Sequence, residues 1–165
     1  MENNKLAEKD FIEQYILKQI NDLQNAGFHY FSFLLIGQAI EVMGAFLDNK
    51  PFRARQQSQI RFANAINQLF DKPYQRINNN NWLYDKLRNH MTHMLIPSDY
   101  LLLVSKSETT AKHLARIDRK LVLVAEDFYI DLQKACNQLL EKIEKGEVKS
   151  KPIASNLFEF GCKKH

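Results

Sequence analysis

The stretch from His29 to Asp48 constrains the fold of this chain more than any other segment. It is apolar on nearly every side of a helical wheel, and it stops at Asn49-Lys50-Pro51 because proline cannot continue a helix. Gln38, Glu41 and glycines interrupt its most apolar part, Phe31–Leu47, which is short for a membrane span. The segment therefore predicts a buried helix that other helices surround.

Four further segments have the apolar spacing of helices. They are Leu6–Ala26, which Gly27 ends; Ser58–Phe70, with Ser58 as its N-cap; Trp82 to about Ile96, stopped by Pro97; and Ala125–Lys145, which Gly146 closes. The segment 71–81 contains a proline and a run of asparagines and is predicted to be a surface loop.

The pattern changes between the last two helices. Tyr100–Val104 and Lys120–Val124 are short, apolar and partly β-branched, as strands are. His113–Ile117 is either a third strand, with Asp118-Arg119 as the turn, or the continuation of a helix from Thr110. The predicted fold class is mainly α: a bundle of about five helices with a small β-hairpin or three-stranded insert between the last two.

With 165 residues, 45% of them hydrophobic, the chain suits one domain over 1–145 and a basic tail over 146–165, in which Leu157–Phe160 is expected to dock. A net charge of +4 permits a nucleic-acid partner without demanding one. Cys136 and Cys162 lie outside any CxxC pattern, which argues against a disulfide framework or a zinc site. The polar N-terminus has no apolar signal core, so a cytoplasmic location without a membrane is expected.

A candidate site lies in the run Leu87–Leu95, which contains Arg88, Asn89 and His93. The arginine fork matches a phosphate group, and histidine is the side chain best suited to move a proton near neutral pH. Together these residues indicate chemistry on phosphodiesters.

The pattern Arg-Asn-x-x-x-His resembles the signature of the HEPN (higher eukaryote and prokaryote nucleotide-binding) domains. The specific likeness is confined to Leu87–Leu95, while the outline of the helical bundle agrees over Leu6–Leu140. The resemblance implies a homodimeric, metal-independent endoribonuclease of toxin or defence type that cuts single-stranded RNA in a cleft between protomers, with no cofactor and with an antitoxin-like protein as a partner. Two alternatives stay open: a non-catalytic module that binds a nucleotide, RNA or protein, and a structural adaptor.

The motif residues also have simpler interpretations. Arg88 could be a salt-bridged helix residue, with Asp85 or Glu41 as partner, and His93 could be half-buried against a carbonyl. His90 and His93 have a spacing found in metal sites, but no third ligand is evident, so no metal is expected.

Glu41 is a carboxylate within the most apolar helix, where it needs a partner or solvent. Gly37, Glu41 and Gly44 form a stripe on that helix. One interpretation is that the stripe faces the predicted helix from Trp82 to about Ile96 (the motif helix) and that Glu41 contacts Arg88, Asn89 or His93. The other interpretation is that the stripe borders solvent.

The densest basic run contains Arg53, Arg55 and Arg61, at the start of the third helix. It could guide an RNA backbone. A solvated loop and helix start is the alternative.

Overall fold

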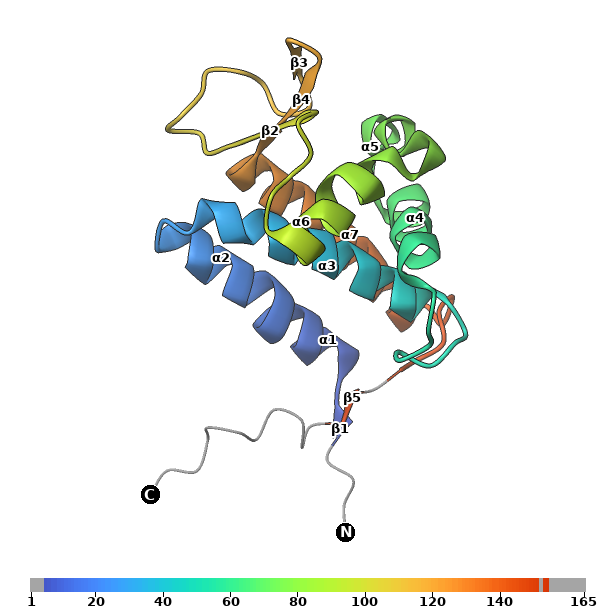
Figure 1. The fold of residues 1–165 in the computed structure, drawn as a ribbon. Coiled ribbons are helices and arrows are strands. Elements are labelled where there is room, and N and C mark those ends of the chain that lie inside the picture. Colours follow the sequence, from blue (N-terminus) through green and yellow to red (C-terminus); the bar gives the residue numbers. More distant parts are fainter. Residues whose placement is uncertain (1–4, 152, 155–165) are drawn as a thin grey trace.

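The computed structural model describes residues 5–151 and 153–154, and it is a mainly α-helical bundle with a small sheet at one end (Figure 1). The helices are α1 (Glu8–Asp10), the π-helical η1 (Phe11–Leu17), α2 (Lys18–Asn25), α3 (His29–Leu47), α4 (Ser58–Leu69), α5 (Lys72–Ile77), the 3₁₀ turn η2 (Asn79–Asn81), the π-helical η3 (Tyr84–Asn89), α6 (His90–Met94) and α7 (Ala125–Glu144). The strands are β1 (Lys5–Leu6), β2 (Leu101–Val104), β3 (Arg116–Ile117), β4 (Lys120–Val124) and β5 (Ile153–Ala154). The predicted fold class is confirmed.

Helix α3 lies in the middle of the bundle and contacts α2, α4, α7 and η3 (Figure 1). Its fully buried side chains include Phe33, Ile36, Ile40, Met43 and Phe46, and each contributes about 1.5–3 kcal/mol of burial free energy. By length and composition alone α3 could also cross a membrane. In the structure most of its apolar side chains pack against other helices, as its sequence predicted.

The prediction of a surface loop over 71–81 is wrong, because part of this segment forms α5. Proline is tolerated in the first turn of a helix, where its missing N–H would have no partner anyway, so Pro73 does not prevent the helix. Tyr74 points inward and is only 2% exposed. Its hydroxyl donates to Asp131 on α7 at 2.9 Å and lies 2.7 Å from His113 Nε2. Helix α5 therefore belongs to the core.

In the larger sheet β4 is the middle strand, parallel to β2 and antiparallel to β3. Asp118 and Arg119 join β3 to β4 with positive φ values of 47° and 68°, which is the geometry of a type I′ hairpin turn. The predicted strands and turn are thus confirmed. The third strand is shorter than predicted, because His113 turns toward the core, where its Nδ1 accepts the Val124 N–H at 2.9 Å.

The chain returns to its start at the far end of the bundle from this sheet, where β5 pairs with β1 (Figure 1). Just before β5, the Lys151 ammonium donates to the carbonyls of Ala45 (2.5 Å), in the last turn of α3, and of Lys50 (2.8 Å), in the loop that follows α3. The described part of the expected tail from 146 onward is therefore attached to the body. The expected docking of Leu157–Phe160 lies outside the described residues.

Candidate active site

Arg88 and Asn89 are the last residues of the π-helical segment η3, and His93 lies in the α-helix that follows. A π-helix has hydrogen bonds between residues five apart and a wider turn than an α-helix. A regular α-helix, with roughly 100° per residue, was expected here, and this expectation is wrong for the segment Tyr84–Asn89. Short π segments occur often at functional sites.

Three side chains of α3 hold the motif helix in place. The contacts join Glu41 to Arg88, Gln38 to Thr92 (2.5 Å) and the Tyr30 hydroxyl to the Leu95 carbonyl. Residue numbers fall along α3 as they rise along η3 and α6, so the two helices run antiparallel. His93 lies on the segment fixed by the last two contacts.

Glu41 and Arg88 form a largely buried ion pair in which Glu41 Oε2 is 2.6 Å from Arg88 Nη2. Their side chains are 18% and 11% exposed. The predicted contact between Glu41 and the motif is confirmed, whereas its effect on activity stays a prediction. The two groups are close but poorly aligned, and within the described residues neither Glu41 Oε2 nor Arg88 Nε has a hydrogen-bond partner. Arg88 Nε is thus a buried donor without a partner in the described part of the chain.

The Tyr84 ring lies 5.6 Å from the guanidinium of Arg88 and restricts its position through a cation–π contact. Sequence reasoning missed this residue, although the spacing of four between Tyr84 and Arg88 on one helix indicates a contact. The arginine is therefore held on two sides, by a carboxylate and by a ring.

The two glycines of the predicted stripe on α3 pack against different helices. A Cβ added at Gly37 would lie 3.5 Å from Cα and Cβ of Arg88, so η3 packs directly on this glycine. A Cβ at Gly44 would lie 1.9 Å from the carbonyl oxygen of Arg61 on α4. The expectation that the whole stripe faces the motif helix is wrong for Gly44, because α4 covers the C-terminal part of α3.

Asn89 and His93 differ in how firmly they are held. Asn89 Nδ2 is 3.5 Å from Asp85 Oδ1, which is the limit of a hydrogen bond. A hydrogen bond from Lys86 lowers the pKa of Asp85, so Asn89 faces an anion. His93 is exposed and has no hydrogen bond or ion pair with any residue that the structure describes. Its imidazole is therefore accessible to a substrate, and the half-buried alternative does not apply.

The predicted RNA-binding arginines do not form one surface. Arg53 and Arg55 are exposed in the loop before α4. Arg61 is 4% exposed, and its guanidinium donates to Asp48 (2.7 Å) and to the carbonyls of residues 51 and 52 (2.8 and 2.7 Å). Because the protein itself occupies these donors, we drop Arg61 from the RNA-binding set.

In the described part of the chain, no three His, Cys, Asp or Glu side chains gather where they could hold a metal ion. Comparison of the chain with protein-family models, with curated proteins and with solved structures finds no match. Arg88, Asn89 and His93, through their geometry and the resemblance of their pattern to the HEPN signature, are therefore the features that indicate a function.

Proposed function

We propose that the protein is a HEPN-like, metal-independent endoribonuclease of toxin or defence type that cuts single-stranded RNA with Arg88, Asn89 and His93. One observation supports this proposal: the exposed His93 lies on a helix that α3 holds by three contacts, and the same helix contains Arg88, whose buried Nε has no hydrogen-bond partner among the described residues. Catalysis needs groups that are both accessible and held in a fixed position.

In this reaction an imidazole nitrogen of His93 takes the proton of a ribose 2′-hydroxyl. The 2′-oxygen attacks the adjacent phosphorus, the bond to the 5′-oxygen of the next nucleotide breaks, and a 2′,3′-cyclic phosphate and a 5′-hydroxyl remain. A protonated imidazole from a second protomer, or water, supplies the proton to the leaving oxygen. Arg88 donates to the phosphoryl oxygens, where negative charge grows in the transition state, and the Asn89 amide orients the phosphate or the histidine.

Exposed apolar side chains near His93 support a homodimer. Met94, Leu95 and Ile96 are 54%, 49% and 62% exposed, and Tyr30 on α3, which contacts Leu95, is 43% exposed. Adjoining apolar side chains of this kind commonly mark an interface. A two-fold dimer formed here would bring two copies of His93 toward a shared cleft, and sedimentation would then give twice the monomer mass of 19.4 kDa.

The burial of Arg88 favours a second candidate function. An arginine that is 11% exposed and paired with a carboxylate is also what a purely structural ion pair looks like. The protein would then be a non-catalytic module that binds a nucleotide, RNA or a protein, such as an antitoxin, through the same face.

Cleavage of a broad panel of single-stranded RNAs in excess EDTA distinguishes these functions. The wild-type protein should cut, and His93→Ala should lose about a hundredfold or more of the rate, the usual contribution of a general base. His90→Ala, on the same helix, is the matched control and should keep most of the rate. No cleavage by the wild-type protein, or equal cleavage by His93→Ala, would favour the non-catalytic module.

Glu41→Gln tests the supporting role of the carboxylate. The amide keeps the shape of the side chain and loses the charge that positions Arg88, so the fold should persist while cleavage weakens. An unchanged rate would mean that Glu41 serves stability alone.

A further inference from the structure

A cavity of about 400 Å³ lies at the N-terminal end of α3, beside the loop that follows β2. Its lining includes His29, Tyr30, Leu103, Ser105, Ser107 and Glu108. These residues come from two segments far apart in sequence. The carboxyl ends of the parallel strands β2 and β4 meet beside it, as they do at ligand-binding crevices of open α/β sheets.

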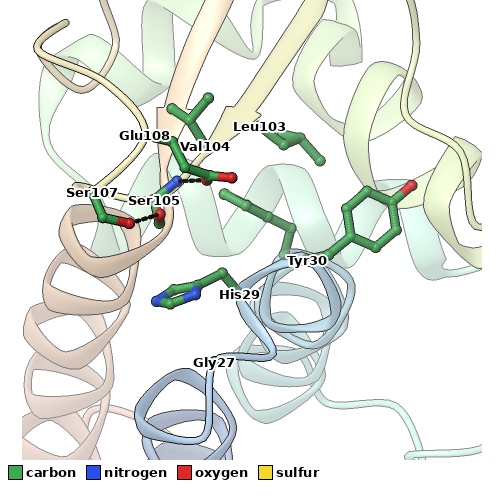
Figure 2. A pocket seen from close by; sticks show the side chains of 9 residues that line it. Gly27, His29, Tyr30, Leu103, Val104, Ser105, Ser107 and Glu108 are labelled. Atoms are coloured by element: carbon green, nitrogen blue, oxygen red, sulfur yellow. Dashed lines mark hydrogen bonds between the residues drawn. The ribbon is translucent and has the colours of Figure 1, made fainter.

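The two sides of the cavity differ in chemistry. Figure 2 shows Ser105, Ser107 and Glu108 together on one side and the Tyr30 ring on the other, with Leu103 above. Glu108 Oε2 accepts the Ser105 N–H at 2.7 Å, and the Ser105 and Ser107 hydroxyl oxygens are 2.8 Å apart. The hydrogen bonds from Ser105 lower the pKa of Glu108, so this side presents an ionised carboxylate. A ligand here meets hydrogen-bond acceptors on one side and Tyr30 on the other.

The charges around the cavity disfavour a phosphate. Glu126 accepts the Lys106 backbone N–H at 2.9 Å and lies 3.4 Å from His29 Nε2. The Lys106 ammonium is bound to Asp127 at 2.7 Å. The carboxylates of residues 108, 126 and 127 therefore exceed the nearby positive charge, and an anion would be repelled. A neutral planar ring with N–H donors fits these walls better.

The cavity is connected to the motif helix through Tyr30. Tyr30 lines the cavity, and its hydroxyl donates to the carbonyl of Leu95, two residues after His93. Along α3, Tyr30 and Gly37 are separated by roughly 10 Å at 1.5 Å per residue, and Gly37 packs against Arg88. A nucleotide strand with a phosphate at Arg88 could thus place a nearby base in the cavity.

We propose that this cavity takes an unpaired nucleobase with an exocyclic amino group, adenine, cytosine or guanine, from the RNA strand that the motif cuts. The ring stacks on Tyr30, as single-stranded bases stack on aromatic side chains, and the amino group donates to Glu108 and the serine hydroxyls. That the base belongs to an RNA substrate depends on the proposed function, whereas the affinity of the cavity for such a base does not.

NMR titration with free nucleosides tests this without any cleavage. Adenosine, cytidine and guanosine should shift the amide signals of Gly27, Ser105 and Ser107 in wild-type protein, and uridine, which lacks an amino group, should bind several times more weakly. Glu108→Gln keeps an oxygen for the Ser105 N–H but loses the charge, and it should remove most of this preference.

Tyrosine variants separate stacking from support of the motif helix. Tyr30→Leu should weaken nucleoside binding about tenfold, the cost of one lost stacking contact. Tyr30→Phe keeps the ring, loses only the bond to Leu95 and should bind normally. Tyr15→Leu, at another exposed tyrosine, is the matched control and should also bind normally.

The outcomes separate the two proposals. Nucleoside shifts at the cavity with no RNA cleavage by the wild-type protein would support the cavity and contradict the proposed function. RNA cleavage without such shifts, or shifts that Glu108→Gln and Tyr30→Leu leave unchanged, would overturn the base-binding cavity and leave the proposed function standing.

Discussion

Two arginines pack against α3, and they differ in how fully the protein occupies their donors. Arg61 donates to both carboxylate oxygens of Asp48 and to two loop carbonyls. Arg88 has one close polar contact, with Glu41, and within the described chain its buried Nε has no partner. Both side chains are mostly buried, so burial does not distinguish them. The difference teaches that two arginines of similar burial can differ in how many of their donors the protein satisfies, and the proposed substrate-binding role of Arg88 depends on that difference.

The largest expected effect on stability comes from Arg61→Ala. The substitution leaves Asp48 and two loop carbonyls without their main donor, so it should cost about 3 kcal/mol of unfolding free energy, at the low end for a broken buried pair because Lys151 still contacts Asp48. Urea unfolding measures this. Arg55→Ala, in the exposed loop, is the control and should stay within about 0.5 kcal/mol of wild type. Equal losses in both variants would contradict a structural role that is specific to Arg61.

A double-mutant cycle compares the two pairs directly. Alanine substitutions of Arg88 and Glu41, singly and together, should give a coupling energy of about 1 kcal/mol, smaller than the same cycle gives for Arg61 and Asp48. The reason is that the Arg88 pair has a single, poorly aligned contact. A coupling as large as that of Arg61 and Asp48 would break the comparison and make Arg88 another structural residue.

Asp48, which binds Arg61, and His113, which lies beside Tyr74, lose their contributions to stability in different pH ranges. Burial raises the pKa of Asp48, but hydrogen bonds from Arg61 and Lys151 outweigh it and leave the pKa below 3.8. The stability from Asp48 is therefore complete above pH 3.8 and is lost as the pH falls through the lower folded value. Burial lowers the pKa of His113 below 6.5, so the unfolded chain takes up that proton first and stability is lost as the pH falls below 6.5.

Between pH 7 and 5 the loss should therefore come from His113 and not from Asp48, by at most about 1.4 kcal/mol per unit of pKa difference. Urea unfolding at both pH values should show the loss in wild-type protein and a smaller loss in His113→Gln. An equal loss in both proteins would mean that other groups cause it.

The sequence predicted the central helix and a contact of Glu41 with Arg88, Asn89 or His93, because a carboxylate within an apolar helix needs a partner, and in the structure that partner is Arg88. It could not predict the burial of Arg61. The partners of Arg61 include loop carbonyls, and a basic run of this kind usually lies in solvent. The base-binding cavity was also missed, since residues 27–33 and 103–108 meet only in the folded chain.

In two other segments the residue types predicted the wrong secondary structure. Pro73 and the run Asn78–Asn81 are residue types typical of a loop. The buried Tyr74, however, donates a hydrogen bond to Asp131, and this contact joins α5 to the core. The π-helical turn at Arg88 leaves no mark in the apolar spacing of the sequence, so a regular helix was expected there.

The most direct test of the comparison is NMR of the arginine Nε–H signals during titration of His93→Ala protein with single-stranded RNA, since this variant should bind RNA without cutting it. The Nε–H signal of Arg88, which is buried in the free protein, should shift as its guanidinium turns from Glu41 to a phosphate oxygen, while that of Arg61, already bonded to Asp48, should stay in place. If Arg88 does not shift, or if both arginines shift equally, Arg88 is not an RNA-binding residue and the account of its unused donor is contradicted.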